Sequence, residues 1–412
     1  MKKFDIKNIN VTAKGVVAIA MLVIMTVAML GYLSWSGFIK PVLWNVIYGI
    51  ERTEFEEDTS FVDKIEVLKG NIESEFDDSV IYYYNMIEFN TAFQYSLGVA
   101  EINFADDSDI VKLNNGYLTS TISEIDVSSN AESLILLNEY LESKDIDMLY
   151  IQAPYKIDQY DDQLPYGIED YSNINADNLL SAIDGEVDYI DLRDLIDDQG
   201  LDHYSLFYKT DHHWTTETGF WAFGEIAQVL NDEYGFNYLE EYCDISNYTV
   251  ETYEDWFLGS WGKRVGQYAV GVDDFSLITP NFDTKFTFEV ENNDIYREGS
   301  FYDTMYDFSN IEEVDYYNLN TYATYIGGDY PLNIIDNLLI EDGKKILLIK
   351  DSFTLVVSPY LALGCDELDI IDSRHYEDSS LVEYIEETNP DIVMFLYNPD
   401  QIENTVMWEY FE

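Results

Sequence analysis

The sequence predicts an α/β protein with a central parallel sheet, and two observations support this fold class. From Ala131 onward, an apolar run typical of a buried strand, IDMLYIQAP, follows an amphipathic segment typical of a helix, AESLILLNEYLESKD. The same alternation returns near the C-terminus, where KKILLIK, ELDIID and DIVMFLY are separated by helical patterns. Strands that alternate with helices indicate a parallel sheet with helices packed on it.

The composition excludes one class of protein and argues against another. With 47% hydrophobic and 16% aromatic residues, the chain has enough apolar surface for a large core, so it is not a disordered protein. Its 80 Asp and Glu against 21 Lys and Arg give a net charge of -59. This argues against a nucleic-acid partner, because such binding needs cations that displace phosphate counterions. Two cysteines, Cys243 and Cys365, make no disulfide scaffold, and the sequence leaves open whether they pair.

An uncharged segment near the N-terminus predicts a membrane anchor. Residues 15–33 read GVVAIAMLVIMTVAMLGYL, and a helix needs about 20 apolar residues to cross a bilayer. Lysines precede this segment and acids dominate after it, which favours a cytoplasmic N-terminus over residues 1–14, a transmembrane helix over 15–38 and an extracytoplasmic body. A cleaved signal peptide is the alternative, but the run is long and lacks a clean small-x-small cleavage site.

The remaining chain is predicted to have one α/β domain built from two pieces. Residues 39–130 form an acidic stalk and an N-terminal extension, and residues 131–231 form the first part of the domain. Over residues 232–338 short aromatic and β-branched runs such as KFTFEV alternate with turn-rich stretches, which predicts a β-rich or irregular insertion. Residues 339–412 complete the domain.

Two of the four histidines lie in the segment YKTDHHWTTETG, which suggests a general base. Asp211 and His213 are two residues apart, so on an extended backbone their side chains point to the same side, whereas His212 points away from Asp211. A carboxylate beside an imidazole fixes its tautomer and stabilises the imidazolium. His213 is therefore the preferred base and His212 the alternative. For a bare Asp-x-His, a helix-entry loop with incidental polar residues is the better explanation.

Ser352 is the candidate nucleophile. In KKILLIKDSFTLVVSPY a buried strand ends at Lys350 and an apolar helix follows, so Ser352 lies on a tight turn at the C-terminal edge of the sheet. Backbone N–H groups at such a turn can hold an oxyanion. A helix N-cap made by Asp351 or Ser352 is the alternative interpretation. Together, Asp211, His213 and Ser352 supply an orienting carboxylate, a base and a nucleophile.

Asp-x-His-Trp followed much later by strand, DSF and helix resembles the SGNH-hydrolase-like domain of the alginate O-acetylation proteins (AlgX and AlgJ type). It resembles their Gram-positive "DHHW" relatives even more closely. The likeness extends to IQAPYKI, FLGSWGKRVG, IIDSRHY and NPDIVMFLYNP, and it covers about residues 75–412. It implies a three-layer α/β/α domain whose triad is Asp211, His213 and Ser352. The sequence departs from the family at Lys350, where the family has Gly, and it has no separate Gly and Asn blocks, so the resemblance does not assign the oxyanion donors.

The resemblance implies a membrane-anchored, extracytoplasmic acyltransferase that O-acetylates a cell-surface or cell-wall polysaccharide through an acyl-Ser352 intermediate. It also implies a membrane-bound O-acyltransferase partner that supplies the acetyl groups. No cofactor is predicted. Two alternatives remain. The same triad could serve a surface carbohydrate esterase, or the domain could be a catalytically inactive glycan-binding module.

Several further residues are candidates for substrate contacts, although a packing or surface role is the better explanation for each of them. They are Lys156, Trp214, Arg264, Arg374 and Asn398. Trp214 adjoins the base, and with Trp256 and Trp261 of the insertion it could stack on sugar rings and exclude water.

A metal site is not predicted. His203 with Asp202, Asp211 and His212 imitates a group of metal ligands, but the spacing matches no strong template.

Overall fold

The computed structural model describes Ile24 and residues 83–104, 109–290 and 295–411. The chain divides into two compact units, Met1–Ile87 and Glu88–Glu412. The strands and the site described below belong to the second unit.

The predicted membrane anchor lies almost wholly outside the described residues. Residues 1–14 and 15–38 are not described, apart from Ile24, which is helical, and the predicted stalk is not described before residue 83. Among the residues that are described, none of the helices combines the length and the apolar character that a membrane span requires.

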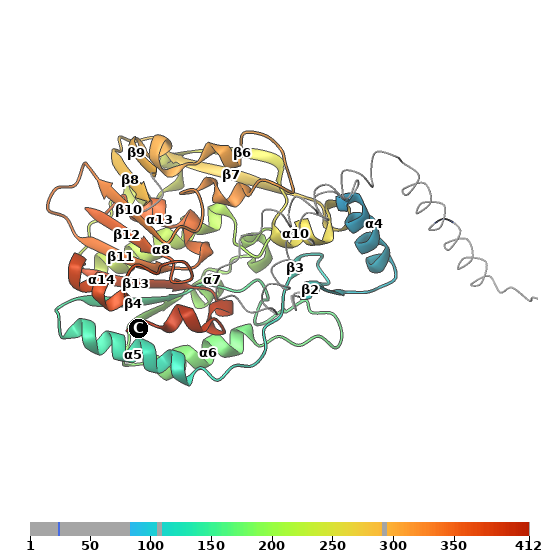
Figure 1. Ribbon diagram of the computed structural model, residues 1–412, viewed down its shortest axis with the longest axis horizontal. Coiled ribbons are helices and arrows are strands. Elements are labelled where there is room, and N and C mark those ends of the chain that lie inside the picture. The colour runs from blue at the N-terminus through green and yellow to red at the C-terminus, as the bar shows by residue number, and fades with distance from the viewer. Residues whose placement is uncertain (1–23, 25–82, 105–108, 291–294, 412) are drawn as a thin grey trace, which may run out of the picture. The chain divides into compact units, whose positions relative to one another are not determined.

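An eight-stranded mixed sheet forms the centre of the second unit (Figure 1). Its strand order is β5-β4-β13-β11-β12-β10-β8-β9. The bounds of these strands, in chain order, are β4 Asp147–Gln152, β5 Tyr189–Asp191, β8 Phe286–Val290, β9 Ile295–Gly299, β10 Leu332–Asn337, β11 Lys345–Lys350, β12 Glu367–Ile371 and β13 Ile392–Tyr397.

The sheet is parallel only in part, which corrects the predicted central parallel sheet. Strands β5, β4, β13, β11 and β12 pair in parallel, whereas β10, β8 and β9 pair antiparallel. All three antiparallel strands come from residues 232–338, the predicted insertion, which thus extends the central sheet. β10 is antiparallel to β12 because residues 338–344 reverse the chain in a loop before β11, without the crossover helix that a parallel connection needs.

Helices cover both faces of this sheet and give three layers. The central strands β11 (KILLIK) and β13 (IVMFLY) are apolar on both faces, as expected for strands buried between helices. Each face has its own hydrophobic cluster, made of side chains from the sheet and from the helices that pack on that face. One face carries α7 (Leu192–Gln199), α8 (Thr216–Glu233) and α13 (Ser358–Leu361), and the other carries α5 (Ser128–Glu142), α6 (Ser172–Ile183) and α14 (Leu381–Thr388).

Smaller elements surround this core. A three-stranded antiparallel sheet contains β1 (Glu101–Asn103), β2 (Asp109–Lys112) and β3 (Leu118–Thr119), and β6 (Tyr248–Phe257) pairs with β7 (Asp273–Pro280). The other helices are α4 (Tyr83–Ser96), α9 (Glu240–Cys243), α10 (Ser260–Val265), α11 (Gln267–Val270) and α12 (Phe301–Met305). The ends of β6 and β7 bring Gly259 and Asp273 to the loop that contains Asp211. Cys243 and Cys365 are free thiols.

Candidate active site

Ser352 lies just beyond the C-terminal end of β11, a strand with parallel neighbours on both sides. It is the first residue of a short 3-10 helix, Ser352–Val356, and its neighbour Asp351 caps that helix. One Asp351 oxygen accepts from the Phe353 N–H (2.9 Å), and the other accepts from the Asn398 N–H (2.7 Å) and from its side-chain amide (3.0 Å). The turn that presents the serine is therefore fixed to the end of β13.

The backbone N–H of Ser352 has no acceptor among the described residues. A free N–H at the start of a helix can donate to an oxyanion that forms on an acyl group bound to the serine. The structure thus provides one candidate oxyanion donor, which the sequence pattern did not assign.

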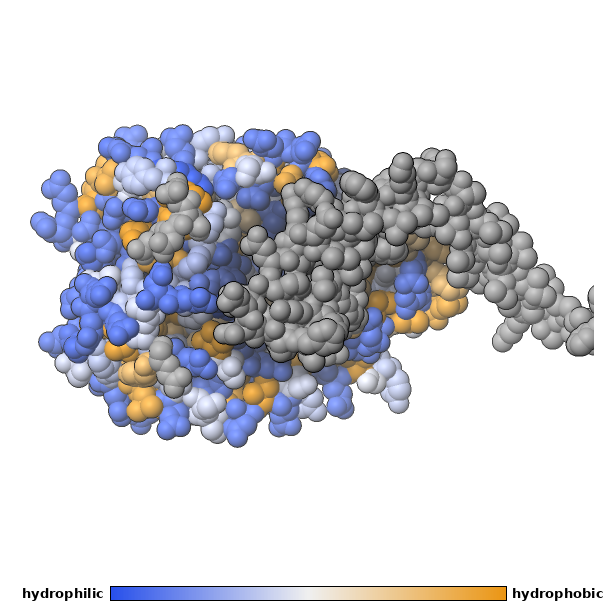
Figure 2. Space-filling view, in the orientation of Figure 1, coloured by the Kyte–Doolittle hydropathy of each residue, from blue (hydrophilic) through white to orange (hydrophobic). Residues whose placement is uncertain are grey.

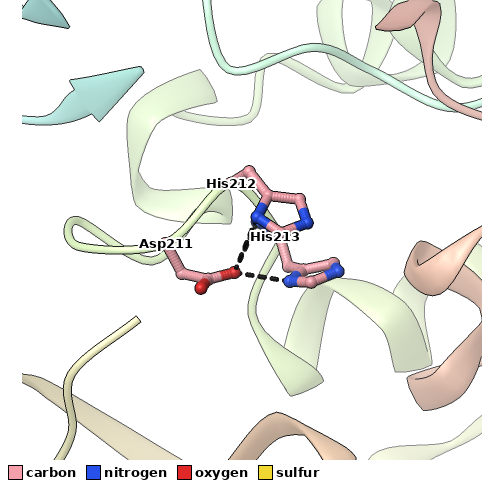
Figure 3. A group of neighbouring side chains, drawn as sticks. All are labelled: Asp211, His212 and His213. Atoms are coloured by element: carbon pink, nitrogen blue, oxygen red, sulfur yellow. Dashed lines mark hydrogen bonds and ion pairs between the residues drawn. The ribbon is translucent and has the colours of Figure 1, made fainter. Parts of the chain in front are cut away.

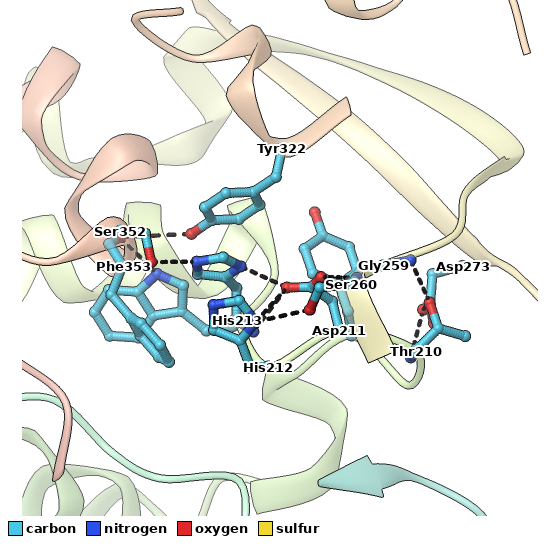
Figure 4. Close-up of polar contacts among 12 residues, drawn as sticks. Thr210, Asp211, His212, His213, Gly259, Ser260, Asp273, Tyr322, Ser352 and Phe353 are labelled. Carbon is cyan, nitrogen blue, oxygen red and sulfur yellow. Dashed lines mark hydrogen bonds and ion pairs between the residues drawn. The ribbon is translucent and has the colours of Figure 1, made fainter. Parts of the chain in front are cut away.

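The loop with Asp211, His212 and His213 is a closed turn. A bridge between Phe207 and Trp214 joins its two ends. His213 Nδ1 hydrogen-bonds to Asp211 Oδ1, and His213 Nε2 lies 2.7 Å from Ser352 Oγ (Figures 3 and 4). Carboxylate, imidazole and hydroxyl therefore form one continuous chain of hydrogen bonds, the arrangement that activates a serine as a nucleophile.

The predicted direction of His212 is wrong. Its Nδ1 lies 3.5 Å from the same Asp211 oxygen that binds His213, and 3.0 Å from Ser260 Oγ (Figure 3). Side chains alternate only along an extended strand, and this segment bends at Asp211 and His212. Even so, His213 is the histidine in contact with Ser352.

Asp211 is held as a carboxylate by its surroundings. Burial alone would raise its pKa, but the adjacent imidazoles of His212 and His213 and the N–H of Ser260, which donates to Oδ2 at 2.5 Å, hold the pKa of Asp211 well below its usual range. Gly259 makes this contact possible, since a Cβ there would lie 2.1 Å from the Cβ of Asp211. A buried anion next to the imidazole is what stabilises the imidazolium during proton transfer.

The His213 ring is enclosed between two other rings (Figure 4). The phenol of Tyr322 stacks on it with centroids 3.9 Å apart, and the imidazole of His212 lies 3.7 Å away. Burial, with the charge of His213, lowers the pKa of His212 to about 3, so His212 is neutral near pH 7. Tyr322 is buried and lies in a segment whose sequence gives no sign of a role in the site.

Two residues predicted to bind substrate have internal partners instead. Trp214 is fully buried, and its Nε1–H donates to the Phe353 carbonyl at 3.0 Å. Asn398 is buried and holds Asp351. Neither side chain presents a surface to a sugar, and both position the serine turn.

Arg374 and Arg264 also have partners within the protein. Arg374 forms a bidentate pair with Asp372, at 2.8 and 2.6 Å, and approaches Asp329 at 3.5 Å. Lys350, the residue that departs from the family pattern, is buried and pairs with the same two carboxylates. The guanidinium of Arg264 lies 4.5 Å from the ring centroid of Phe104.

Lys156 hydrogen-bonds to the backbone of the loop that contains Asp211. Its Nζ donates to the carbonyl of Tyr208 at 2.6 Å and to the carbonyl of Asp211. Burial lowers the pKa of Lys156 to about 7. Lys156 thus ties the end of β4 to the turn that carries the triad.

Asp211, His212 and His213 also form a group of possible metal ligands, with ligand atoms within 4.8 Å of one another. Both Asp211 oxygens accept hydrogen bonds, and both nitrogens of His213 face a partner. The four-residue group considered from the sequence does not assemble as such, because His203 bonds to the carbonyls of Tyr155 and Lys156. The geometry suits proton transfer to and from Ser352.

Comparisons with known proteins bear out the family resemblance. A family model described as the SGNH hydrolase-like domain of the acetyltransferase AlgX matches residues 113–249, which include Asp211 and His213 but not Ser352. This confirms the resemblance that the Asp-x-His-Trp segment indicates. No curated protein sequence matches the chain.

Two solved structures show the fold. Bacillus cereus PatB1, solved with a sulfonyl adduct, is 19% identical, with a TM-score of 0.63 over 74% of this chain and 100% of that chain. A DHHW family protein from Eubacterium siraeum is also 19% identical, with a TM-score of 0.55 over 75% of this chain and 96% of that chain. The second unit therefore shares the α/β fold of these two structures.

Proposed function

We propose, with the AlgX-type SGNH-like domain as the premise, that this protein is a serine acyltransferase that O-acetylates a cell-surface or cell-wall polysaccharide. The observation that carries the proposal is the chain of hydrogen bonds from Asp211 through His213 to Ser352. These hydrogen bonds lead to the buried turn at the edge of the sheet that carries Ser352.

The chemistry follows from these contacts. His213 Nε2 takes the Ser352 proton while Ser352 Oγ attacks the carbonyl of an acetyl donor, and the donor's leaving group departs with the proton. The developing oxyanion lies near the Ser352 N–H, and Asp211 stabilises the imidazolium. In the second half, His213 takes a proton from a sugar hydroxyl, whose oxygen attacks the acetyl-serine and releases Ser352.

The setting of this reaction is part of the proposal. The uncharged segment 15–33, with lysines before it and acids after it, supports a single membrane anchor with the catalytic unit outside the cell. An extracytoplasmic domain has no access to cytoplasmic acetyl-CoA, so we propose a membrane-bound O-acyltransferase partner that passes acetyl groups outward. Protease added to intact cells is expected to digest the body beyond residue 40, and full protection would contradict this topology.

The test of function uses cells that carry the native protein or its Ser352→Ala variant. We expect the ester-linked acetyl content of the surface polysaccharides to fall in the variant strain. A rise in acetyl content would instead show a surface esterase with the same triad. Unchanged acetyl content, together with a Ser352 that does not react with a covalent serine probe, would show an inactive glycan-binding module.

A further inference from the structure

The triad itself is almost closed to solvent, but one side of it is bordered by partly exposed groups. Asp211, His213 and Ser352 are 3%, 6% and 8% exposed. The side chain of His212, which covers one side of the His213 ring, is 29% exposed. Ser260, whose hydroxyl lies 3.0 Å from His212 Nδ1, is exposed as well.

Trp261 continues this border. It follows Ser260 in the first turn of α10, is partly exposed, and its ring centroid lies 5.6 Å from that of His212. The Nζ of Lys156 lies 4.8 Å from the Trp261 ring centroid and donates to two backbone carbonyls, so this buried amine contacts the indole ring from a fixed position. An indole face beside an imidazole and a hydroxyl offers both the apolar surface and the hydrogen bonds that a sugar ring needs.

The charges around the site do not favour an anionic ligand. Lys350 and Arg374 share the carboxylates of Asp329 and Asp372. The two cations on the same helix as Trp261 keep their charge but contact other parts of the protein. Lys263 donates to the carbonyl of Leu319 at 2.7 Å, and the Arg264 guanidinium lies 4.5 Å from the ring centroid of Phe104. The chain as a whole carries a net charge of -59, and the face seen in Figure 2 is largely hydrophilic. A polymer with a carboxylate on every sugar would be repelled by this field.

We propose that Trp261, His212 and Ser260 form the acceptor subsite, and that this subsite takes an uncharged sugar. The inference rests on the acyl transfer proposed above. The sugar stacks on Trp261 and places one hydroxyl at His213 Nε2. His213 takes that proton while the sugar oxygen bonds to the acetyl carbonyl carbon, the bond from that carbon to Ser352 Oγ breaks, and His213 returns the proton to Ser352.

The test measures how much acetyl is transferred to a sugar and how much is released as acetate by hydrolysis. The full chain in detergent receives p-nitrophenyl acetate with an uncharged hexose oligomer, or with a uronic acid oligomer of equal length. We expect the ratio of acetylated sugar to free acetate to be about tenfold higher for the uncharged oligomer at low salt. Equal ratios, or a higher ratio for the uronic acid oligomer, would overturn the proposed substrate class.

The variants test the subsite itself. Trp261→Ala is expected to lower the ratio for the uncharged oligomer by about fivefold or more, and Trp261→Phe to lower it less, because a smaller ring remains. The matched control is Trp221→Ala, which removes a partly exposed tryptophan of α8 whose Nε1–H donates to Gln199. Equal ratios in Trp261→Ala and Trp221→Ala would overturn the subsite.

A binding measurement separates this inference from the proposed function. Titration of the full chain with the uncharged oligomer should change its tryptophan fluorescence, and Trp261→Ala should lose most of that change. If this pattern occurs but Ser352 never carries an acetyl group, the subsite stands and acyl transfer is wrong. If Ser352 is acetylated but the fluorescence change persists in Trp261→Ala, acyl transfer stands and the subsite is wrong.

Discussion

The phenol ring of Tyr322 lies almost parallel to the imidazole of His213, with 3.9 Å between the centroids and 13° between the planes. Tyr322 is buried, so water does not screen this contact. An aromatic face stabilises a cation above it by about 0.5–2 kcal/mol. Tyr322 therefore both holds the orientation of His213 and favours the imidazolium that forms when Ser352 gives up its proton.

Replacement of Tyr322 by Leu is expected to slow acetylation of Ser352 by about tenfold, because the imidazolium loses its aromatic face. Tyr322→Phe keeps the face and should retain most of the rate. The rate of p-nitrophenol release in the first turnover measures this step. A Phe variant as slow as the Leu variant would place the effect in the hydroxyl group.

Replacement of His213 is expected to slow Ser352 acetylation far more than replacement of His212. His213→Ala and Asp211→Asn should lower the rate of Ser352 acetylation by about a thousandfold or more, since the base is lost or wrongly oriented. His212→Ala should lower it far less, because His213 is the residue in contact with Ser352. The reverse order in the same assay would move the base to His212.

Gly259→Ala should disable the site without any change in a reacting group. A Cβ at this position would lie 2.1 Å from the Cβ of Asp211 and 2.5 Å from its Cα, so the carboxylate must shift. A displaced orienting group is expected to slow acetylation on the order of a hundredfold. The control is Gly224→Ala in α8, where the nearest atom is 3.9 Å away, and this change should raise helix stability by about 0.5–1 kcal/mol. A Gly259→Ala variant with native activity would show that Asp211 tolerates displacement.

The buried Asp369 is expected to make stability depend on pH. Its Oδ2 accepts from the Tyr384 hydroxyl at 2.9 Å, and its Oδ1 has no hydrogen-bond partner among the described residues. Burial raises its pKa from 3.8 to about 7, so the folded state binds this proton more tightly than the unfolded state does. Stability should therefore fall as the pH rises from about 4 to about 7 and then level off.

Asp369→Asn removes this ionisation, so the variant should gain stability relative to the native protein across the same pH range. Urea unfolding midpoints at about pH 4 and about pH 8 measure the gain. Glu142→Gln, an exposed position in α5, is the control. An Asn variant whose pH dependence matches that of the native protein would contradict the assigned cause.

The parts of the site that the sequence could predict are those with local signals. Ser352 follows an apolar strand, and the ends of parallel strands meet at one edge of the sheet, so its place followed from the pattern. Tyr322 had no such signal, because its contact with His213 depends on how an irregular segment folds back onto the sheet. The burial of Trp214 could not be predicted from the sequence either, since a tryptophan next to a catalytic base is compatible with both a core and a substrate-binding surface.

The predicted direction of His212 failed for a physical reason. The two-residue rule holds for an extended backbone, whereas the bridge between Phe207 and Trp214 closes this segment into a turn. The prediction of strand direction in the sheet was limited in a similar way. Alternating strands and helices predicted the parallel strands, but β8, β9 and β10 lie in a stretch without that alternation, where their direction depends on loops.

The central claim is that Ser352 forms an acyl-enzyme, and mass spectrometry of the intact protein tests it most directly. After brief exposure to p-nitrophenyl acetate and an acid quench, the native chain should gain one acetyl group, located on the peptide that contains Ser352. Ser352→Ala should gain none. An acetyl group on another residue, or an equal gain in Ser352→Ala, would contradict the account.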